Sequence, residues 1–101
     1  MSEPFFSVVI PTFNQCNYLK RALKSVLSQK FHNYEIIVID NFSNDKTSSV
    51  VKSFKKKNKI YKKIRNRGII SKSRNKGINI SKGKWIAFLD SDDTWSKDKL
   101  E

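Results

Sequence analysis

The sequence predicts an α/β fold: an open, mostly parallel sheet of about four strands, with helices on both faces in three layers. Three short apolar segments are typical of strands that are buried on both faces, and a fourth segment, which alternates charged and apolar residues, suits a short strand at an edge. Segments with helical spacing of apolar residues lie between them, and this alternating order implies parallel strands joined by right-handed crossovers. A length of 101 residues suits one domain, residues 1–101, with a single core.

The first strand and helix occupy the N-terminal third of the chain. Phe5–Ile10 is apolar and β-branched, and Pro11 is expected to end the strand because proline has no amide proton for the ladder. Tyr18–Gln29 carries apolar residues at helical spacing and predicts an amphipathic helix. Either Asn14 or Asn17 is expected to cap it.

The second strand is predicted at Glu35–Ile39 and ends at Asp40. Residues 41–45 have turn composition and are expected to supply a cap for the next helix. Apolar positions within 47–54 line one side of that helix, which we expect to run into Lys55–Lys57, because cations favour a helix C-terminus.

The third strand and helix follow a lysine-rich segment. Lys59–Ile64 alternates charged and apolar residues, which predicts a short strand at an edge of the sheet. Ser71–Ser81 predicts a helix, with Ile78 and Ile80 facing inward. Gly83 is the expected C-cap.

The fourth strand, Trp85–Leu89, reads as buried. After it, Ser96 is expected to cap a helix that barely starts before Glu101.

Composition narrows the partners and the compartment. Lys and Arg number 21 against 9 acidic residues, a formal charge of +12 that suits a nucleotide, a nucleic acid or an anionic membrane surface. Cys16 is the single cysteine, which fits a reducing compartment. The sequence contains no apolar run of membrane-span length and no evident signal peptide, so we expect a cytoplasmic location. Because of its positive charge, a peripheral location at a membrane surface is the alternative.

Three acidic residues, Asp90, Asp92 and Asp93, follow the fourth strand within four positions. Like charges this close raise one another's pKa, and a bound cation removes that cost. Oxygen ligands favour Mg²⁺ or Mn²⁺. Asp and Ser also favour helix caps and turns, so taken alone the cluster fits a metal site and a cap equally.

Three loops at the carboxyl ends of strands carry the remaining candidate residues. Since parallel strands end at one edge of a sheet, these loops should lie together. An aromatic ring and amides suit a base, and carboxylates suit ribose hydroxyls and a metal-held diphosphate. The sequence lacks a P-loop and a G-x-G-x-x-G after the first strand. The loop residues are Pro11, Thr12, Phe13 and Asn14; then Asp40 and Asn41; then Asp90, Ser91, Asp92 and Asp93.

Four segments in the right order cover almost the whole chain: Ser7–Asn14, Glu35–Thr47, Asn66–Ile78 and Gly83–Asp93. Together they resemble the N-terminal, nucleotide-binding half of inverting family-2 glycosyltransferases with the GT-A fold. The resemblance implies a Rossmann-like sheet, a nucleotide-sugar donor that is usually a UDP-sugar, and Mg²⁺ or Mn²⁺.

The resemblance also implies roles for the first two loops. Pro11, Thr12 and Phe13 match the segment that packs against the nucleobase, where the family often has Tyr in place of Phe13. Asp40 and Asn41 match a pair that is commonly Asp-Asp, whose second member contacts uracil. Asn41 can donate and accept hydrogen bonds whereas Asp only accepts, so uracil is the expected base but is less firmly specified.

At the third loop, Asp90-Ser91-Asp92 matches the D-x-D signature of the family. The resemblance implies ribose and diphosphate contacts there, with the metal at Asp92 and Asp93. Arg74 matches an arginine near the nucleotide and implies a phosphate contact. A charge on the surface of a helix is an equally open interpretation of Arg74.

No catalytic residue is identified in the sequence. An inverting transfer needs a general base for the acceptor hydroxyl, and in the family that carboxylate lies well downstream. Nothing marks Glu3, Asp98 or Glu101 as the base. We therefore expect donor binding, without transfer by these residues alone, whether the chain is a fragment, a natural short form or a decayed gene product. An unpaired sheet edge would favour a homo-oligomer, and the acceptor would be a glycan or lipid, the latter at a membrane surface.

Two other functions are weighed. Lysines and arginines in 55–67 near Phe54 and Tyr61 would suit a small basic nucleic-acid-binding protein. However, no nucleic-acid motif is present and the acidic cluster is badly placed for a polyanion, so nucleic acid is not the expected partner. A remnant that binds nothing is the third interpretation.

Overall fold

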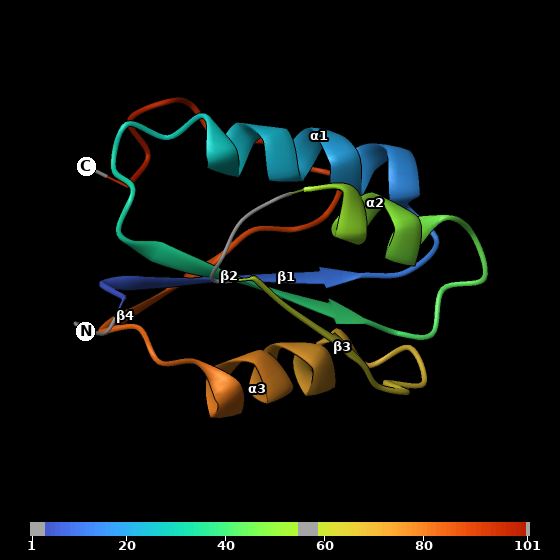
Figure 1. Cartoon of the computed structure of the whole chain (residues 1–101). Coiled ribbons are helices and arrows are strands. Elements are labelled where there is room, and N and C mark those ends of the chain that lie inside the picture. The colour runs from blue at the N-terminus through green and yellow to red at the C-terminus, as the bar shows by residue number, and fades with distance from the viewer. Residues whose placement is uncertain (1–3, 55–58, 101) are drawn as a thin grey trace.

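The computed structural model describes residues 4–54 and 59–100. Its sheet is parallel throughout with strand order β3-β2-β1-β4. Helices α1 and α2 cover one face and α3 covers the other (Figure 1), so the predicted α/β fold is confirmed. Helix α2 ends at Ser53 and Phe54 is extended, so the prediction that this helix runs into Lys55–Lys57 is wrong; Lys55–Lys57 themselves lie outside the described residues. In chain order the elements are β1 Phe6–Thr12, α1 Cys16–Leu27, β2 Tyr34–Asp40, α2 Thr47–Ser53, β3 Lys59–Lys63, α3 Ile70–Ile80 and β4 Trp85–Phe88.

The two faces of the sheet have cores of different size. Under α1 and α2, buried apolar side chains from β1, β2 and α1 form the larger cluster. Leu19, Ala22, Leu23 and Val26 supply the inward row of α1, as the helical spacing predicts. Under α3 the cluster is smaller: Val9, Ile37 and Ile39 are buried, and Ile60, Ile64, Ile80 and Ile86 pack against them.

Strand β1 continues through Pro11 to Thr12, so the prediction that Pro11 ends it is wrong. The Thr12 carbonyl accepts a hydrogen bond from Asn41 on the β2 side, whereas the Val9 carbonyl accepts one from Leu89 on the β4 side. Backbone polar groups alternate along a strand, so Pro11 faces the β4 side. Because β4 ends at Phe88, opposite Val9, no partner there needs the missing amide proton.

Helix α1 begins at Cys16, with Gln15 at the N-cap, so neither Asn14 nor Asn17 caps it. The cap is supplied from the second loop: Asp45 Oδ2 accepts the Cys16 amide proton, while Oδ1 accepts from Thr47 at the start of α2. Desolvation raises the pKa of Asp45, but the hydrogen bonds from Thr47 and Cys16 outweigh it and hold that pKa below its usual value. One carboxylate therefore joins the starts of two helices. The turn composition of 41–45 predicted the contact with α2 but not the contact with α1.

Helix α3 packs against the sheet through small residues. Ser73 and Gly77 are its buried positions, and an added Cβ at Gly77 would lie 2.4 Å from Val9 Cγ1. Ile80 packs inward as predicted, whereas Ile78 is 43% exposed and the prediction for it is wrong. The close approach at Gly77 leaves no depth for a large side chain beneath the middle of the helix.

Gly83 is not the cap of α3, which ends at Ile80 with Ser81 as its C-cap. Instead it lies where the chain crosses the start of β1, and an added Cβ would be 2.5 Å from Ser7 N and 2.6 Å from the Phe6 carbonyl carbon. The Gly83 amide donates to Ser7 Oγ, and the Ser7 hydroxyl donates to the buried carboxylate of Glu35. The Lys82 amide also donates to Glu35, which fixes this crossing.

Strand β4 is an edge strand, so its prediction as a buried strand is wrong. Trp85 is 57% exposed and Phe88 is 44% exposed, because no described element pairs with its outer side. The helix expected from Ser96 is also not formed: the described residues after it make turns. Among the described helices, none has the length and apolar character needed to cross a membrane.

Candidate functional site

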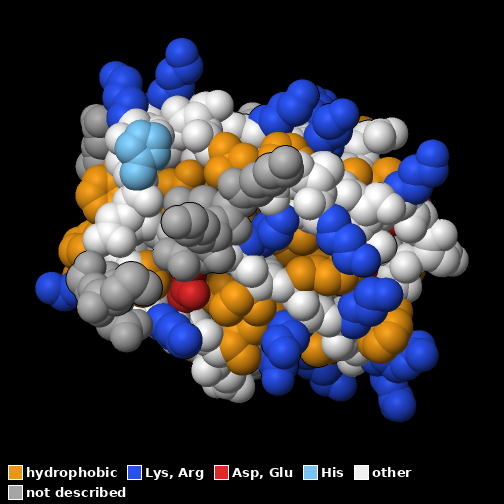
Figure 2. All heavy atoms as spheres, in the orientation of Figure 1, with side chains coloured by type: hydrophobic (Ala, Val, Ile, Leu, Met, Phe, Trp, Pro, Cys, Tyr) orange, Lys and Arg blue, Asp and Glu red, His pale blue; other side chains and the backbone are white. Residues whose placement is uncertain are grey.

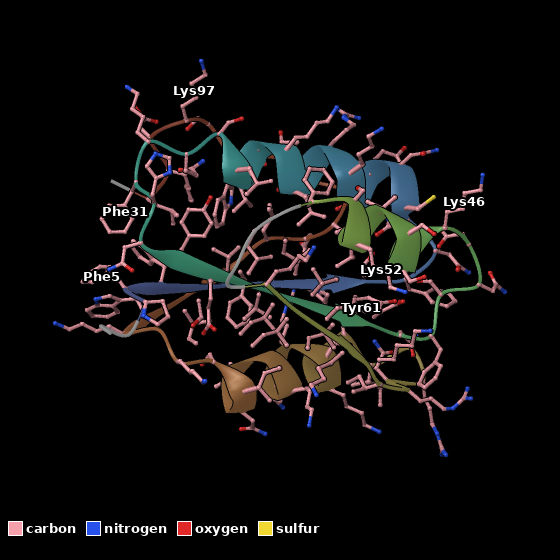
Figure 3. All side chains as sticks on the ribbon, in the orientation of Figure 1. Phe5, Phe31, Lys46, Lys52, Tyr61 and Lys97 are labelled. Carbon is pink, nitrogen blue, oxygen red and sulfur yellow. The ribbon has the colours of Figure 1, made fainter. Side chains whose placement is uncertain are left out.

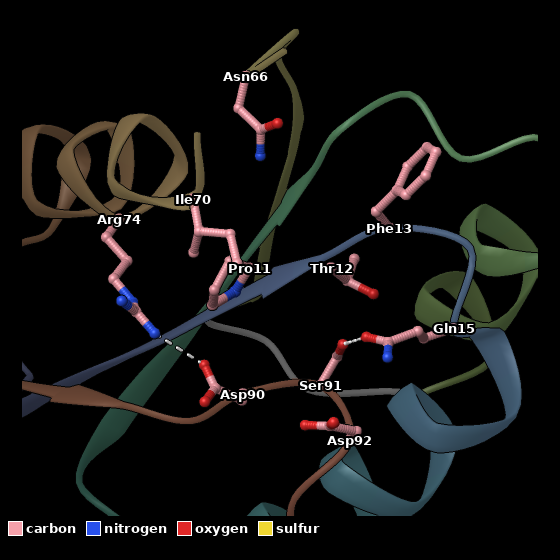
Figure 4. A pocket seen from close by; sticks show the side chains of 10 residues that line it. All are labelled: Pro11, Thr12, Phe13, Gln15, Asn66, Ile70, Arg74, Asp90, Ser91 and Asp92. Carbon is pink, nitrogen blue, oxygen red and sulfur yellow. Dashed lines mark hydrogen bonds and ion pairs between the residues drawn. The ribbon is translucent and has the colours of Figure 1, made fainter. Parts of the chain in front are cut away.

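A cavity of about 360 Å³ opens at the carboxyl ends of the strands (Figure 4). It forms where β1 extends past the end of β4, so that the segment after β4 closes one side and α3 the other. The structure brings together seven predicted site residues here. The lining residues are Pro11, Thr12, Phe13, Gln15, Asn66, Ile70, Arg74, Asp90, Ser91 and Asp92.

The end of β1 forms the floor and rim of the cavity. Pro11 and Thr12 are buried, and the ring of Phe13 is 51% exposed at the rim. Thr12 Oγ1 has no hydrogen-bond partner among the described residues although it is shielded from solvent. An unpaired buried hydroxyl costs about 1–3 kcal/mol. The cavity floor therefore favours a ligand with a polar group at this position.

Arg74 and Asp90 point toward each other across the cavity mouth (Figure 4), with Nη2 3.0 Å from Oδ1. Their side chains are 40% and 57% exposed, so the pair lies in high dielectric and contributes about 0–1 kcal/mol. Arg74 Nε is buried without a partner, and the guanidinium carbon lies 5.9 Å from the centre of the Phe88 ring. The guanidinium thus has spare donors for an anion in the cavity.

Ser91 joins the acidic loop to the first loop. It is buried, and its hydroxyl donates to Gln15 Oε1 (Figure 4). Because Gln15 stands at the start of α1, this bond sets the acidic loop against the helix N-terminus. Ser91 is therefore placed to position its two acidic neighbours.

Asp92 and Asp93 face different hollows. Asp92 lines the first cavity, whereas Asp93 lines a second one of about 440 Å³ together with Phe88, Trp95 and Lys99. Arg74 and Asp90 border both. The metal role predicted for Asp92 and Asp93 stays a prediction.

Within residues 4–54 and 59–100, no three His, Cys, Asp or Glu side chains gather in a way that could hold an ion by themselves. The oxygen ligands that are present still suit a hard cation. Mg²⁺ commonly takes one or two carboxylates, with the remaining ligands from phosphate and water. A divalent ion at Asp92 would therefore need oxygens from a bound diphosphate, so nucleotide and metal are expected to bind together.

Asp40 is buried and does not line the cavity. Its Oδ1 accepts hydrogen bonds from the Ser43 amide and hydroxyl, and its Oδ2 accepts from the Tyr61 hydroxyl. Burial raises the pKa of Tyr61, and the hydrogen bond to Asp40 and the negative charges of Asp40 and Asp45 raise it further. In this arrangement Asp40 braces β3 and the second loop, and its predicted nucleotide contact stays a prediction.

The raised pKa of Tyr61 predicts a loss of stability at high pH. The unfolded chain releases the phenolic proton near pH 10 while the folded chain retains it, so the stabilisation is full below pH 10 and falls as pH rises above it. In urea unfolding at pH 8 and pH 10.5, we expect Tyr61→Phe to lose less stability between the two values than the parent chain. Burial also raises the pKa of Tyr34, but Tyr34 is present in both proteins and contributes the same loss of stability to each. An equal loss in the two proteins would contradict the assignment.

Asn14 and Asn41 also lie outside the cavity wall. Asn14 has φ of 49°, its amide donates to Ser43 Oγ, and its Oδ1 accepts from the Asn44 amide. Asn41 Oδ1 accepts the amide proton of Asn66. Both side chains therefore connect neighbouring loops, and direct base contacts by them stay predictions.

Three lining residues were not predicted from the sequence: Gln15, Asn66 and Ile70. Gln15 directly follows a predicted strand-end loop, which is a signal that points to it. Asn66 is buried. Its Nδ2 donates a hydrogen bond to Ser73 Oγ, and its Oδ1 accepts one from the Gly68 amide. Ile70 carries no chemical signal, because only the packing of α3 brings it to the cavity.

The sequence model of glycosyl transferase family 2 matches residues 7–101, almost the whole chain. The chain belongs to this family. An uncharacterised glycosyltransferase of Rickettsia conorii is 43% identical over 102 aligned residues, which cover all of this chain and 17% of the relative. This family-2 chain is accordingly much shorter than the curated relatives it matches.

Solved structures show the same architecture. Staphylococcus aureus TarS 1–349 in complex with UDP superimposes with a TM-score of 0.88 at 33% identity, covering 94% of this chain and 29% of that one. The same TarS fragment is also solved with UDP-GlcNAc. A mannosyltransferase of Pyrobaculum calidifontis, solved with GDP-Man and Mn²⁺, has a TM-score of 0.82 at 21% identity, covering 94% of this chain and 29% of that one. This last similarity shows the fold alone.

Proposed function

We propose that this chain is the donor-binding part of an inverting glycosyltransferase, and that it binds a UDP-sugar together with a divalent metal, Mn²⁺ or Mg²⁺. The observation that carries the proposal is the cavity at the strand ends, where an exposed aromatic ring, an arginine and two carboxylates meet. The crystal complexes of TarS with UDP and UDP-GlcNAc support it, since TarS shares the fold at 33% identity.

The parts of the nucleotide would divide among the walls of the cavity. Phe13 offers a ring face for the base at the rim, and Thr12 Oγ1 offers an unpaired hydroxyl in the floor. Arg74 would exchange its exposed partner Asp90 for a phosphate oxygen at little cost, because that ion pair is weak. Asp90, once released, is free to accept from a ribose hydroxyl.

Asp92 would hold the metal against the diphosphate. When bound, a divalent ion supplies Lewis-acid stabilisation of the departing nucleoside diphosphate. Ser91, hydrogen-bonded to Gln15, keeps the Asp92 backbone in place for this contact. No described residue is assigned as general base, so the function proposed for these residues is donor binding and activation of the leaving group.

Calorimetry with UDP and Mn²⁺ tests this function. We expect saturable UDP binding that strengthens at least tenfold when Mn²⁺ is present, and weaker binding of GDP under the same conditions. A panel of nucleotide-sugars with Mn²⁺, scored for binding and for release of free nucleotide, would then identify the donor. Absence of UDP binding with and without Mn²⁺ would refute the proposal.

A further inference from the structure

The charge of this chain is concentrated in one continuous part of the sequence. Residues 46–89 hold 15 of the 21 Lys and Arg residues and contain no Asp or Glu. In the fold this part supplies α2 on one face of the sheet, α3 on the other face, and the two edge strands β3 and β4 (Figure 1). Figure 2 shows Lys and Arg side chains spread over the face in view, with apolar side chains between them and little acidic surface there.

We use the term basic face for the exposed cations on β3, on the following turn and on α3. Lys62 pairs in register with Ile39, whose side chain packs on the α3 side of the sheet, so Lys62 points to that side. Among the described residues, the only ion pair joins Arg74 and Asp90, so no carboxylate neutralises the basic face. Its members are Lys62, Arg65, Arg67, Lys72 and Lys76; Lys63, the next residue on β3, points to the opposite side of the sheet.

Exposed isoleucines lie on the same helix as two of these cations: at 100° per residue, Ile70 and Ile78 fall on the flank of α3 opposite Lys72 and Lys76, and Ile69 directly precedes the helix. Ile69 is 48% exposed, Ile70 52% and Ile78 43%, from the start to the end of α3. Single exposed apolar residues are ordinary, but aliphatic side chains beside an unneutralised basic surface are the pattern of an interfacial membrane contact. Ile70 also lines the nucleotide cavity, so this apolar row reaches its mouth.

We propose that the basic face and its isoleucines dock this domain onto an anionic lipid surface. Charge complementarity selects the partner class, because clustered Lys and Arg attract acidic lipid headgroups. Nucleic acid has the same charge, but single-strand binding relies on exposed aromatic rings for base stacking. Within residues 59–84 the described exposed apolar side chains are isoleucines, and the one aromatic residue, Tyr61 (Figure 3), is partly buried and bonded to Asp40. The exposed ring next to the basic face, Phe42, is already stacked by the Arg65 guanidinium, whose carbon lies 4.4 Å from the ring centre. Isoleucine suits the boundary between headgroups and acyl chains instead.

Sedimentation with vesicles tests the docking surface. We expect the chain to sediment with vesicles made of equal parts phosphatidylcholine and phosphatidylglycerol, and to stay in solution with phosphatidylcholine alone. Replacing Lys62, Lys72 and Lys76 by Gln should lower the partition coefficient about a hundredfold, because each Lys near an anionic lipid surface strengthens binding severalfold. Failure of the parent chain to bind the mixed vesicles overturns the proposal.

A matched variant separates a specific face from net charge. Lys20→Gln, Arg21→Gln and Lys24→Gln remove the same three charges from the exposed side of α1, on the opposite face of the sheet. We expect this variant to keep nearly all of the vesicle binding, apart from the small loss due to net charge. If the two triple variants lose binding equally, the basic face has no special role and the proposal fails.

The apolar part of the surface is tested separately. Ile69→Ser with Ile78→Ser leaves the cavity residue Ile70 intact and should lower the partition coefficient at least tenfold, whereas Tyr18→Ser on α1 should not. Binding to a duplex or single-stranded oligonucleotide in preference to the mixed vesicles would assign the basic face to nucleic acid and overturn the lipid assignment. UDP binding is scored in the same samples, so failure at the vesicle stays distinct from failure at the nucleotide site.

Discussion

Replacing Asp92 by Asn is expected to lower the affinity for UDP in the presence of Mn²⁺ about a hundredfold, which corresponds to roughly 2.7 kcal/mol. Asp92 lines the cavity and offers a carboxylate, and the described residues provide too few acidic neighbours to replace it. An amide keeps the shape but loses the negative charge that a hard cation prefers. UDP binding without metal should change little, because the ring and arginine contacts remain.

The measurement is calorimetric titration of UDP with and without Mn²⁺. Asp98→Asn is the matched control, since Asp98 is exposed, lines neither cavity and loses the same charge. Asp93→Asn locates the ion more finely, because Asp93 faces the second cavity. If Asp92→Asn keeps the full Mn²⁺ effect while Asp93→Asn loses it, the metal belongs to the second cavity and our placement is wrong.

Gly83→Ala is expected to destabilise the fold by about 3 kcal/mol or more, at the upper end of overpacking costs. The added Cβ would lie 2.5 Å from Ser7 N and 2.6 Å from the Phe6 carbonyl carbon. These are backbone atoms of the central strand, and they cannot rotate away as a side chain can. Moving the chain instead would break the bond to Ser7 and disturb the amide that satisfies the buried Glu35.

Urea unfolding followed by circular dichroism provides the measurement. Gly68→Ala is the control: nothing lies within 4 Å of the added Cβ, but φ is +80°, so we expect a cost of about 1–2 kcal/mol from backbone strain alone. Gly77→Ala should fall between the two, because its obstacle is the Val9 side chain. A Gly83→Ala protein no less stable than Gly68→Ala would show that the crossing over β1 can open.

The buried strands and α1 follow directly from sequence pattern. Continuous apolar runs around Val8 and Ile37 specify strands that are buried on both faces. The helical spacing from Leu19 to Val26 specifies a helix that is buried along one stripe. Once the strands are parallel, their carboxyl ends must share an edge. This is why Thr12 and Asp92, although far apart in sequence, could be predicted to lie near one another. Arg74, which lies on a helix, was expected there only because of the family resemblance.

Side-chain partnerships were not specified by local pattern. Asp45 caps α1 from another loop, and Asp40 turns inward to Tyr61 and Ser43. Each carboxylate had several possible donors in the sequence, and only the spacing of β1, β2 and β3 selected one. The continuation of β1 through Pro11 likewise depended on where β4 ends, which is a property of the sheet.

The sequence by itself determined the parallel α/β fold, the membership in family 2 that the resemblance implied, and the edge of the sheet where the polar residues gather. Only the tertiary structure decided which of those residues line the cavity, that Gly77 and Gly83 are points of close approach, and that Ile70 and Ile78 stay exposed on α3. The physical reason is range. Hydrophobic periodicity is a local property of the chain. Contact between segments, by contrast, depends on the distances that the packed core imposes.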